Sequence, residues 1–434
     1  MMSRPLARVF GSLQAGRYAW YVLGVLCLVY TCNWMDRYVL VILLEPIKND
    51  LHLSDANLGL LSGFAFATIY SLTGIPIARW ADRGVRRSII AIGLSVWSLM
   101  TAASGLARGF GTLLAARVGV AVGESTCSPA ASSLIADYFP PTRRATAFAL
   151  YGLGISVGMG LGLILGGWVN ELHGWRVAFL VVGCPGLLLA LLVRTTVREP
   201  ERGGREGSEV DAANYSMSEA LRAIVSRKSF LAYALGLGLF SFSGNAFETW
   251  TPVYLVRSLH MGTGAVGTLS GLVEGLGGVI GTLGSGLLAD RLGSGDERWY
   301  LWLPALTSAL MIPCMAMFLH SNDGVMFVFY FVTLICTNAY MAPMVAITQR
   351  VMPLRMRALS TALLYLVLNL IGPGAGPWVA GILSDVFTST YGVEAVRVAL
   401  SVTLVGAAFG VILTLVAARR LSADIALRAA YNAN

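Results

Sequence analysis

The chain has 434 residues, of which 56% are hydrophobic and only 12% are charged, and its mean hydropathy is +0.70. Soluble globular proteins carry about 25% charged residues, so the composition excludes a soluble protein. It also excludes a nucleic-acid-binding domain, despite a formal net charge of +8. We therefore expect a protein embedded in the lipid bilayer, and we interpret the basic excess as the signal that orients it there.

Apolar stretches separated by short polar segments run through the whole chain. A transmembrane helix needs about 20 mostly apolar residues, and twelve stretches approach or exceed that length. The first six are predicted at 17–44, 56–80, 87–107, 111–137, 144–170 and 175–194. The other six are predicted at 229–257, 263–289, 299–319, 324–350, 358–386 and 393–418. The predicted fold class is an all-α integral membrane protein with 12 transmembrane helices.

The longest polar segment, 195–228, lies between the sixth and seventh predicted helices and mixes acidic residues, basic residues and glycines. We predict an N-terminal six-helix bundle over 1–194, a cytoplasmic linker over 195–228 and a C-terminal six-helix bundle over 229–434. In the predicted fifth helix, glycines recur every four residues, which predicts close packing against a neighbouring helix. These glycines are Gly154, Gly158, Gly162 and Gly166.

The basic residues indicate the orientation, because positively charged loops stay on the cytoplasmic side of the membrane. With both termini in the cytoplasm, most of the 31 basic residues fall in cytoplasmic segments. Arg37 and Arg117 fall inside the membrane, and the outside loops hold Lys48, Arg108, Arg176, Arg257 and Arg397. We expect a multi-pass protein of the cell inner membrane or plasma membrane with both termini cytoplasmic.

The second half of the chain repeats the first in the same direction. Asn33 and Asp36 of the first predicted helix correspond to Asn245 and Glu248 of the seventh, at an offset of about 210 residues. The loops after the second and eighth helices repeat an Ala-Asp-Arg sequence, and those after the fourth and tenth repeat a proline followed four residues later by Arg-Ala. Such a repeat predicts two pseudo-symmetric bundles with a site at their interface.

Two kinds of motif give this repeat a family resemblance. The loop GLLADRLG (286–293) resembles the cytoplasmic motif of the major facilitator superfamily (MFS), whose fold consists of two such bundles. Within that superfamily, NWMDRY (33–38) and RVGVAVGESTCSPAASSLIADYFP (117–140) resemble the Spinster family. The resemblance implies secondary active transport by alternating access. It also implies an amphipathic, lipid-like solute of the lysophospholipid or sphingolipid-phosphate type.

Ionisable side chains inside a bilayer cost several kcal/mol and therefore mark transport pathways or buried pairs. We place six of them within the bilayer: Asp36, Arg37, Arg117, Glu124, Glu248 and Glu274. Arg117 and Glu124 are two helical turns apart on one face of the fourth helix, about 10 Å along its axis. From the rise per residue of the first and fourth helices, we expect the first four of these groups to meet in the outer half of the N-terminal bundle.

Two interpretations of these four residues remain. The charges could neutralise one another in a purely structural set. Alternatively they form a switch, because opening and closing an arginine pair changes how strongly a buried carboxylate holds a proton. We predict that Asp36 and Glu124 carry proton coupling, and that Arg37 and Arg117 compete with the proton or bind an anionic headgroup. The proton is then the coupling ion, and no cofactor, metal or catalytic residue is expected.

The solute cavity is predicted from aromatic and polar residues on the helices that line the two halves. They are Tyr30, Asn33, Trp34, Phe64, Asn245, Phe247, Glu248, Trp250, Glu274, Tyr365 and Asn369. A mainly apolar cavity with few charges suits an amphipath better than a sugar. A carrier of hydrophilic organic anions or drugs, and an uncoupled lipid facilitator without proton dependence, remain alternatives.

The cytoplasmic helix ends carry charges that suggest a gate. We expect ion pairs between the two halves to hold the inner mouth shut when the outer mouth is open. The gate residues are Asp82, Arg83, Arg144, Asp290, Arg291 and Arg357. We expect the protein to act as a monomer and not as an enzyme.

Overall fold

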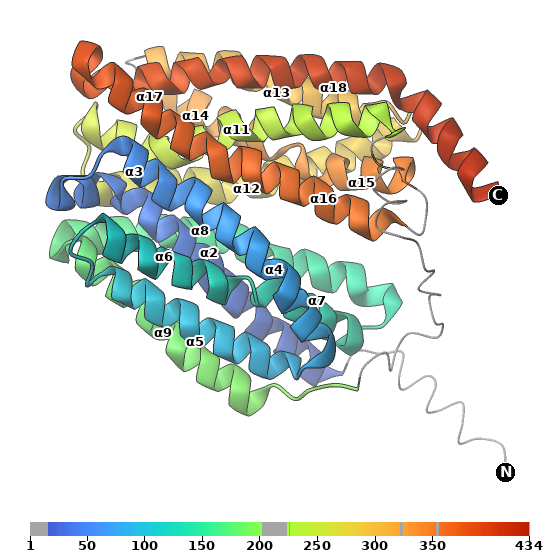
Figure 1. Ribbon diagram of the computed structural model, residues 1–434, viewed down its shortest axis with the longest axis horizontal. Helices are drawn as coiled ribbons and strands as arrows, with labels where there is room; N and C mark the ends of the chain where they lie inside the picture. The colour runs from blue at the N-terminus through green and yellow to red at the C-terminus, as the bar shows by residue number, and fades with distance from the viewer. Residues whose placement is uncertain (1–15, 202–223, 225, 322–323, 353–355, 434) are drawn as a thin grey trace. The chain divides into compact units, whose positions relative to one another are not determined.

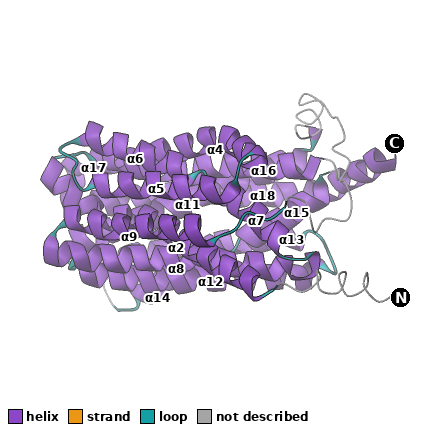
Figure 2. Cartoon of the chain, turned by 90° about the horizontal axis from the view of Figure 1, so that it is seen from below, coloured by secondary structure: helices purple, strands orange, loops and turns teal. Residues whose placement is uncertain are grey.

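The computed structural model describes residues 16–201, 224, 226–321, 324–352 and 356–433. Within these ranges the chain forms helices joined by short loops, and it contains no strand (Figure 2). The all-α prediction is therefore confirmed for the part of the chain that the structure describes.

The described chain packs into two compact units. Unit 1 contains the described residues of Met1–Leu51, Thr68–Val210 and Gly262–Gly271, and unit 2 contains those of His52–Ala67, Asp211–Met261 and Leu272–Asn434. Each unit therefore takes in one short segment from the predicted bundle of the other half.

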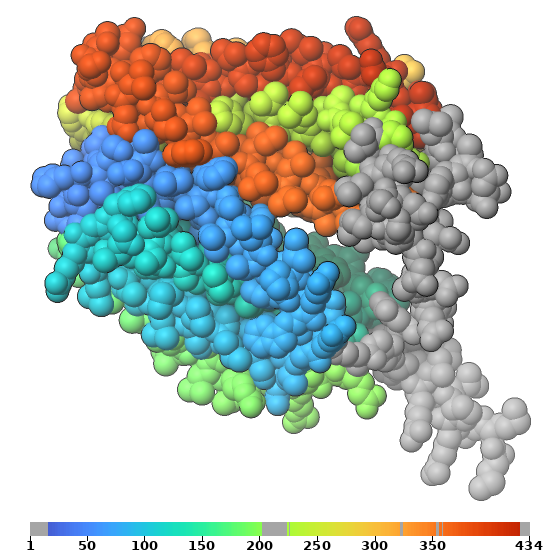
Figure 3. Space-filling view, viewed as in Figure 1, coloured from blue at the N-terminus to red at the C-terminus, as the bar shows by residue number. Residues whose placement is uncertain are grey.

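Unit 1 is built around two long helices, α2 (Arg17–Leu51) and α8 (Pro141–His173), which pack along each other. The helix α5 (Arg86–Ser104) packs on α6 (Phe110–Glu124) and on α9 (Trp175–Thr196). Helices α4 (Ala65–Arg83) and α7 (Cys127–Tyr138) complete the set. Figures 1 and 3 show α5 and α6 side by side, with their side chains filling the space between the ribbons.

Unit 2 is built around α11 (Lys228–Arg257) and α18 (Ala395–Ala433), which also pack along each other (Figure 1). Around them lie α13 (Trp299–His320), α14 (Met326–Asn338) and α15 (Met341–Val351), together with the part of α12 (Thr263–Gly293) from Leu272 onward. The remaining span consists of α16 (Arg357–Asn369), the π-helical η3 (Leu370–Ala375) and α17 (Gly376–Tyr391), followed by the 3-10 turn η4 (Gly392–Glu394). The short helix α3 (Asp55–Gly59) and the π-helical η1 (Leu60–Phe64) pack against α17.

The predictions of single helices over 111–137 and 324–350 are wrong, because each span is broken near its middle. The first consists of α6 and α7, and the second of α14 and α15. Pro129 and Pro343 each occupy the third position after the break. A proline there cannot donate a backbone hydrogen bond, and its ring displaces the carbonyl four residues earlier, which is at Ser125 or Ala339. The breaks fall at equivalent positions, as the sequence repeat requires.

Ten ranges of the described residues are long and apolar enough to cross a membrane. The last of them, Leu359–Ile425, contains two spans, α16 to α17 and α18. The fourth predicted span, which consists of α6 and α7 and carries Arg117 and Glu124, is not among the ten. Counting Leu359–Ile425 as two, the described residues contain eleven ranges of this kind, and α6 with α7 lies at the place of the predicted fourth helix.

Two helix ends lie well beyond their predicted positions. The helix α2 continues to Leu51 rather than 44, and α18 continues to Ala433 rather than 418. The predictions ended where polar residues interrupt the apolar run. Hydropathy marks the edge of the bilayer, whereas backbone hydrogen bonds continue the helix into water.

The π-helical segments η1 and η3 cross at glycines. A Cβ atom on Gly63 would lie 2.6 Å from the carbonyl oxygen of Gly374, and one on Gly59 would lie 2.4 Å from that of Pro377. Pro373 lies inside η3, where it removes one backbone donor and widens the local turn. Short π-helical segments often occur at functional sites, and this one lies on the span that carries Tyr365 and Asn369.

The contact between α2 and α8 depends on the predicted glycine row. A Cβ atom on Gly158 would lie 2.4 Å from the carbonyl oxygen of Thr31 and 2.7 Å from the Cβ atom of Trp34. We expect Gly158→Ala to lower the free energy of unfolding by about 1–3 kcal/mol, because the backbone of α2 has to move away. A Cβ atom on Gly152 of the same helix would meet nothing within 4 Å.

Gly152→Ala is therefore the matched control, and it should be neutral or stabilising by up to about 1 kcal/mol, since alanine favours a helix. Thermal unfolding of the purified variants measures both effects. Equal unfolding midpoints for the two variants would contradict the packing argument.

Candidate functional site

Four charged side chains of unit 1 gather between α2 and α6. Asp36, Arg117 and Glu124 are each 2% exposed or less, and the Arg37 side chain is 21% exposed. The backbone of α2 places Asp36 and Arg37 next to each other, while Arg117 and Glu124 lie two turns apart on α6. The structure therefore brings together the four residues that the sequence singled out.

The pairing within this cluster is specific. Arg37 donates from Nε to Oε2 of Glu124 over 2.6 Å, and Arg117 donates from Nη1 to the backbone carbonyl of Asp36 over 3.4 Å. Both contacts join α2 to α6. A movement of one helix along the other would therefore break an ion pair and change the surroundings of both carboxylates.

Two carboxylate oxygens in the cluster have no hydrogen-bond partner, namely Oδ1 of Asp36 and Oε1 of Glu124. The side chains of Trp97 and Thr101 on α5 lie near Asp36, and Asn33 lies near Glu124. A buried carboxylate oxygen without a partner is costly while charged, and a proton removes that cost. Each carboxylate therefore has an oxygen at which a proton would relieve this cost, and proton coupling at Asp36 and Glu124 stays a prediction.

Aromatic rings surround the guanidinium of Arg37. Its Cζ lies 4.9 Å from the ring centroid of Trp34 and 4.8 Å from that of Tyr70. Tyr30 stacks on Tyr151 with ring centroids 4.3 Å apart. Trp34 and Tyr30 were predicted from the sequence. Tyr70 and Tyr151 were not, because nothing in an apolar helix sequence indicates which group a tyrosine will contact.

The aromatic residues predicted for the cavity in unit 2 have different environments. The ring of Phe247 is fully buried against Phe318 and Tyr330, and the indole of Trp250 donates to the carbonyl of Pro377 over 2.9 Å. These two rings pack in the core of unit 2 in this conformation, so their place in a solute cavity stays a prediction.

The other predicted cavity residues of unit 2 differ in how exposed they are. Phe64 lies 4.9 Å from the ring centroid of Trp378. Asn245 donates to the backbone and hydroxyl oxygens of Ser241, and Asn369 precedes η3. Tyr365 is 40% exposed, whereas Glu248 and Glu274 are buried.

The predicted gate residues lie at helix ends, and most of them are exposed. In unit 2, Asp290 accepts a hydrogen bond from the Tyr300 hydroxyl over 2.9 Å, and Arg350 donates to the same hydroxyl over 3.0 Å. In unit 1, Arg144 donates to the carbonyl of Ala136 at the end of α7 over 2.8 Å. Ion pairs between the halves stay a prediction for the gate residues Asp82, Arg83, Arg144, Asp290, Arg291 and Arg357.

A buried arginine, Arg86, connects several helix ends of unit 1. From the sequence it was counted only among the basic residues that indicate the orientation in the membrane. Arg86 is 1% exposed and donates to Glu199 over 2.7 Å and to Ser133 over 2.8 Å. It also forms an ion pair with Asp137. This cluster joins the start of α5 to the end of α7 and to the segment after α9, so it fixes the ends of three spans.

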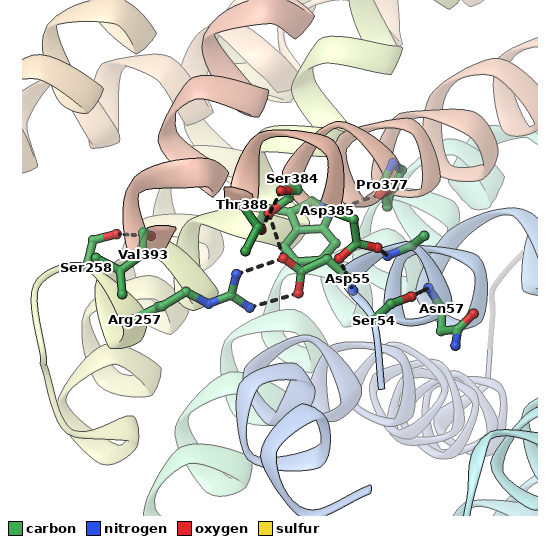
Figure 4. A network of polar contacts seen from close by, with 12 residues as sticks. Ser54, Asp55, Asn57, Arg257, Ser258, Pro377, Ser384, Asp385, Thr388 and Val393 are labelled. Carbon is green, nitrogen blue, oxygen red and sulfur yellow. Dashed lines mark hydrogen bonds and ion pairs between the residues drawn. The ribbon is translucent and has the colours of Figure 1, made fainter. Parts of the chain in front are cut away.

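A second network that the sequence reading missed lies in unit 2 (Figure 4). Asp55 is fully buried and accepts hydrogen bonds from both terminal nitrogens of Arg257, over 2.7 and 2.9 Å, and from the Ser384 hydroxyl over 2.6 Å. Asp385 accepts from the backbone N–H groups of Asp55 and Ala56 at the start of α3. The network ties α3 to α11 and α17. In the sequence, Asp55 and Arg257 lie at the ends of predicted helices, where charged residues are common, so nothing indicates that they pair.

Comparison with known proteins places these features in a family context. The family model of the Major Facilitator Superfamily matches residues 26–321. The chain is 34% identical over 403 residues to a protein of Mycolicibacterium smegmatis described as an MFS-type efflux pump, and the match covers 92% of this chain and 93% of that protein. It is 27% identical over 385 residues to Protein spinster of Drosophila melanogaster, with 86% of this chain and 63% of that protein covered.

Solved structures agree with the sequence comparisons. A bacterial homologue of the human lysosomal transporter Spinster, in an inward-facing and unoccupied conformation, superposes with a TM-score of 0.86 at 30% identity, covering 95% of this chain and 99% of that chain. The inward-facing and occupied conformation gives a TM-score of 0.83 at 29% identity, with the same coverage.

Proposed function

The chain belongs to the Major Facilitator Superfamily and to its Spinster family, and from this premise we propose that it is a proton-coupled secondary active transporter of an amphipathic, lipid-like solute. It is a multi-pass membrane transporter of the Spinster type. The proposed location is the cell inner membrane or plasma membrane with both termini in the cytoplasm, which the distribution of basic residues supports.

The main support for proton coupling is the buried cluster of Asp36, Arg37, Arg117 and Glu124. Arg37 lies 2.6 Å from Glu124, and one oxygen on each carboxylate lacks a partner. When a proton binds Glu124, the carboxyl no longer attracts Arg37, so protonation and the position of α2 relative to α6 depend on each other. This dependence lets a proton gradient drive a conformational cycle.

The solute class follows from the balance of apolar and charged surface near the proposed path. Aromatic side chains outnumber charges among the predicted cavity residues, and the charges of unit 1 form one compact cluster. An acyl chain or aromatic body suits the apolar part, and Arg37 and Arg117 suit an anionic headgroup. The similarity to an efflux pump favours movement of the solute out of the cell.

A chain-length series tests the solute class. We expect the affinity of lysophospholipids to rise about fourfold for each fully buried CH₂, which corresponds to about 0.8 kcal/mol, until the cavity is filled. Binding to the purified protein and pH-driven flux in proteoliposomes are measured on the same series. Flat affinity, together with saturable pH-driven uptake of a small hydrophilic anion, would overturn the lipid class in favour of organic anions. Flux without any pH dependence would indicate an uncoupled facilitator.

A further inference from the structure

A second pair of buried acidic residues lies in unit 2. Glu274 on α12 is 1% exposed, and neither of its carboxylate oxygens has a hydrogen-bond partner. Glu248 on α11 is 7% exposed and interacts electrostatically with Glu274. In contrast to the cluster of Asp36 and Glu124, the neighbouring ionisable group that acts on Glu274 is another carboxylate.

Tyrosines and small polar side chains complete the surroundings of this pair. Tyr340, at the break between α14 and α15, interacts electrostatically with Glu248 and with Tyr365 of α16. The Tyr340 hydroxyl donates to Oγ of Ser241 over 3.2 Å. Ser241 and Glu248 lie two turns apart on α11, with Asn245 between them. The site therefore combines two carboxylates with aromatic rings from two other spans.

The chemistry of the pair calls for a cation. Two carboxylates close together in a low-dielectric interior cannot both be ionised at an acceptable cost unless a positive charge accompanies them. No group of three or more His, Cys, Asp or Glu side chains capable of holding a metal occurs among the described residues. Aromatic rings around a positive charge are typical of sites for organic ammonium groups.

We propose that Glu248 and Glu274, with Tyr340 and Tyr365, form a subsite in unit 2 for an alkylammonium group of the transported amphipath. This inference rests on the proposed transport function and adds a headgroup preference to it. A solute with a cationic nitrogen would place that nitrogen at the carboxylates of α11 and α12. The rings of Tyr340 and Tyr365 would contact its N-alkyl groups.

The test compares two probes of the same shape on the purified full chain in lipid nanodiscs, without a pH gradient. One is 4-phenylbutyl-trimethylammonium, and the other is its uncharged isostere with carbon in place of nitrogen. We expect the wild-type protein to bind the cation at least tenfold more tightly. We expect Glu274→Gln to remove this preference and to leave binding of the isostere unchanged. Glu394→Gln, which removes a partly exposed carboxylate paired with Arg397 in the same unit, is the matched control and should keep the preference.

Two outcomes would overturn the subsite. One is equal binding of the two probes by the wild-type protein, a result that does not depend on any variant folding correctly. The other is a Glu274→Gln variant with an unchanged unfolding midpoint that still prefers the cation tenfold. Because binding is measured without a gradient, a failure of proton coupling would leave the expected result intact. Conversely, a wild-type protein that shows no cation preference but normal pH-driven flux of a lysophospholipid would refute only the subsite.

Discussion

Replacing Glu124 with glutamine is expected to abolish proton-driven uphill transport while the protein stays folded. Glutamine keeps the shape of the side chain and an oxygen that can accept from Arg37, whose Nε lies 2.6 Å from Oε2 of Glu124. It cannot take up or release a proton. Arg37 also keeps the faces of Trp34 and Tyr70, which stabilise its charge. The variant should therefore retain the fold and lose the step that couples the proton to the solute.

The same result is expected for Asp36→Asn, since Oδ1 of Asp36 is the other carboxylate oxygen of the cluster without a partner. Solute accumulation in proteoliposomes with an imposed pH gradient should fall to the level of empty vesicles. Exchange of labelled against unlabelled solute should continue, because it needs no net proton movement. The unfolding midpoint measured on the same preparations checks that the fold is retained.

A matched control removes a carboxylate that is also ion-paired but exposed. Asp50 in unit 1 lies 2.6 Å from Arg176, and both side chains are 44% exposed. Exposed ion pairs contribute little to stability. The Asp50→Asn variant should therefore transport the solute like the wild-type protein. If the Asp36 and Glu124 variants accumulated solute at the wild-type rate, proton coupling at this cluster would be wrong.

Most of the fold could be predicted from the sequence because two strong signals set it. Apolar runs of bilayer length give the spans, and the offset of about 210 residues gives the repeated halves. The breaks at Ser125 and Ala339 were missed, although Pro129 and Pro343 mark them. A hydropathy profile does not register a proline inside an apolar run. The helix nevertheless breaks there, because the proline ring displaces the carbonyl four residues earlier. The equivalent positions of the two prolines were the signal that could have revealed both breaks.

For the candidate site, the sequence allows a prediction of which residues lie close together, but not of which atoms pair. Helical rise places Asp36, Arg37, Arg117 and Glu124 at compatible depths. It does not show that Arg37 pairs with Glu124 or that Arg117 reaches the backbone of α2, because both depend on how each helix is rotated about its axis. The partners of Asp55 are even harder to predict, because Arg257 lies more than 200 residues away along the chain and Ser384 more than 300.

The network around Asp55 is expected to stabilise unit 2 far more than an exposed ion pair of the same composition. The carboxylate is fully buried and accepts three hydrogen bonds, two of them from one guanidinium. Asp55→Ala leaves Arg257 partly buried without its acceptor, and Arg257→Ala leaves a buried carboxylate without its cation. Each change should lower the free energy of unfolding by about 3–5 kcal/mol.

The double variant Asp55→Ala with Arg257→Ala should cost clearly less than the sum of the single variants, because no charge is then left behind without its partner. Thermal and denaturant unfolding of the four proteins measures this coupling, and the same cycle on Glu394 and Arg397 is the control. That control pair is about one-third exposed on both sides, so its coupling should stay within about 1 kcal/mol. If the losses in the free energy of unfolding were additive, Asp55 and Arg257 would contribute only through packing and not through their charges. A large coupling would mean that the ion pair holds α3, at the start of the second span, to α11. This end of the span could then move away from α11 only when the pair separates.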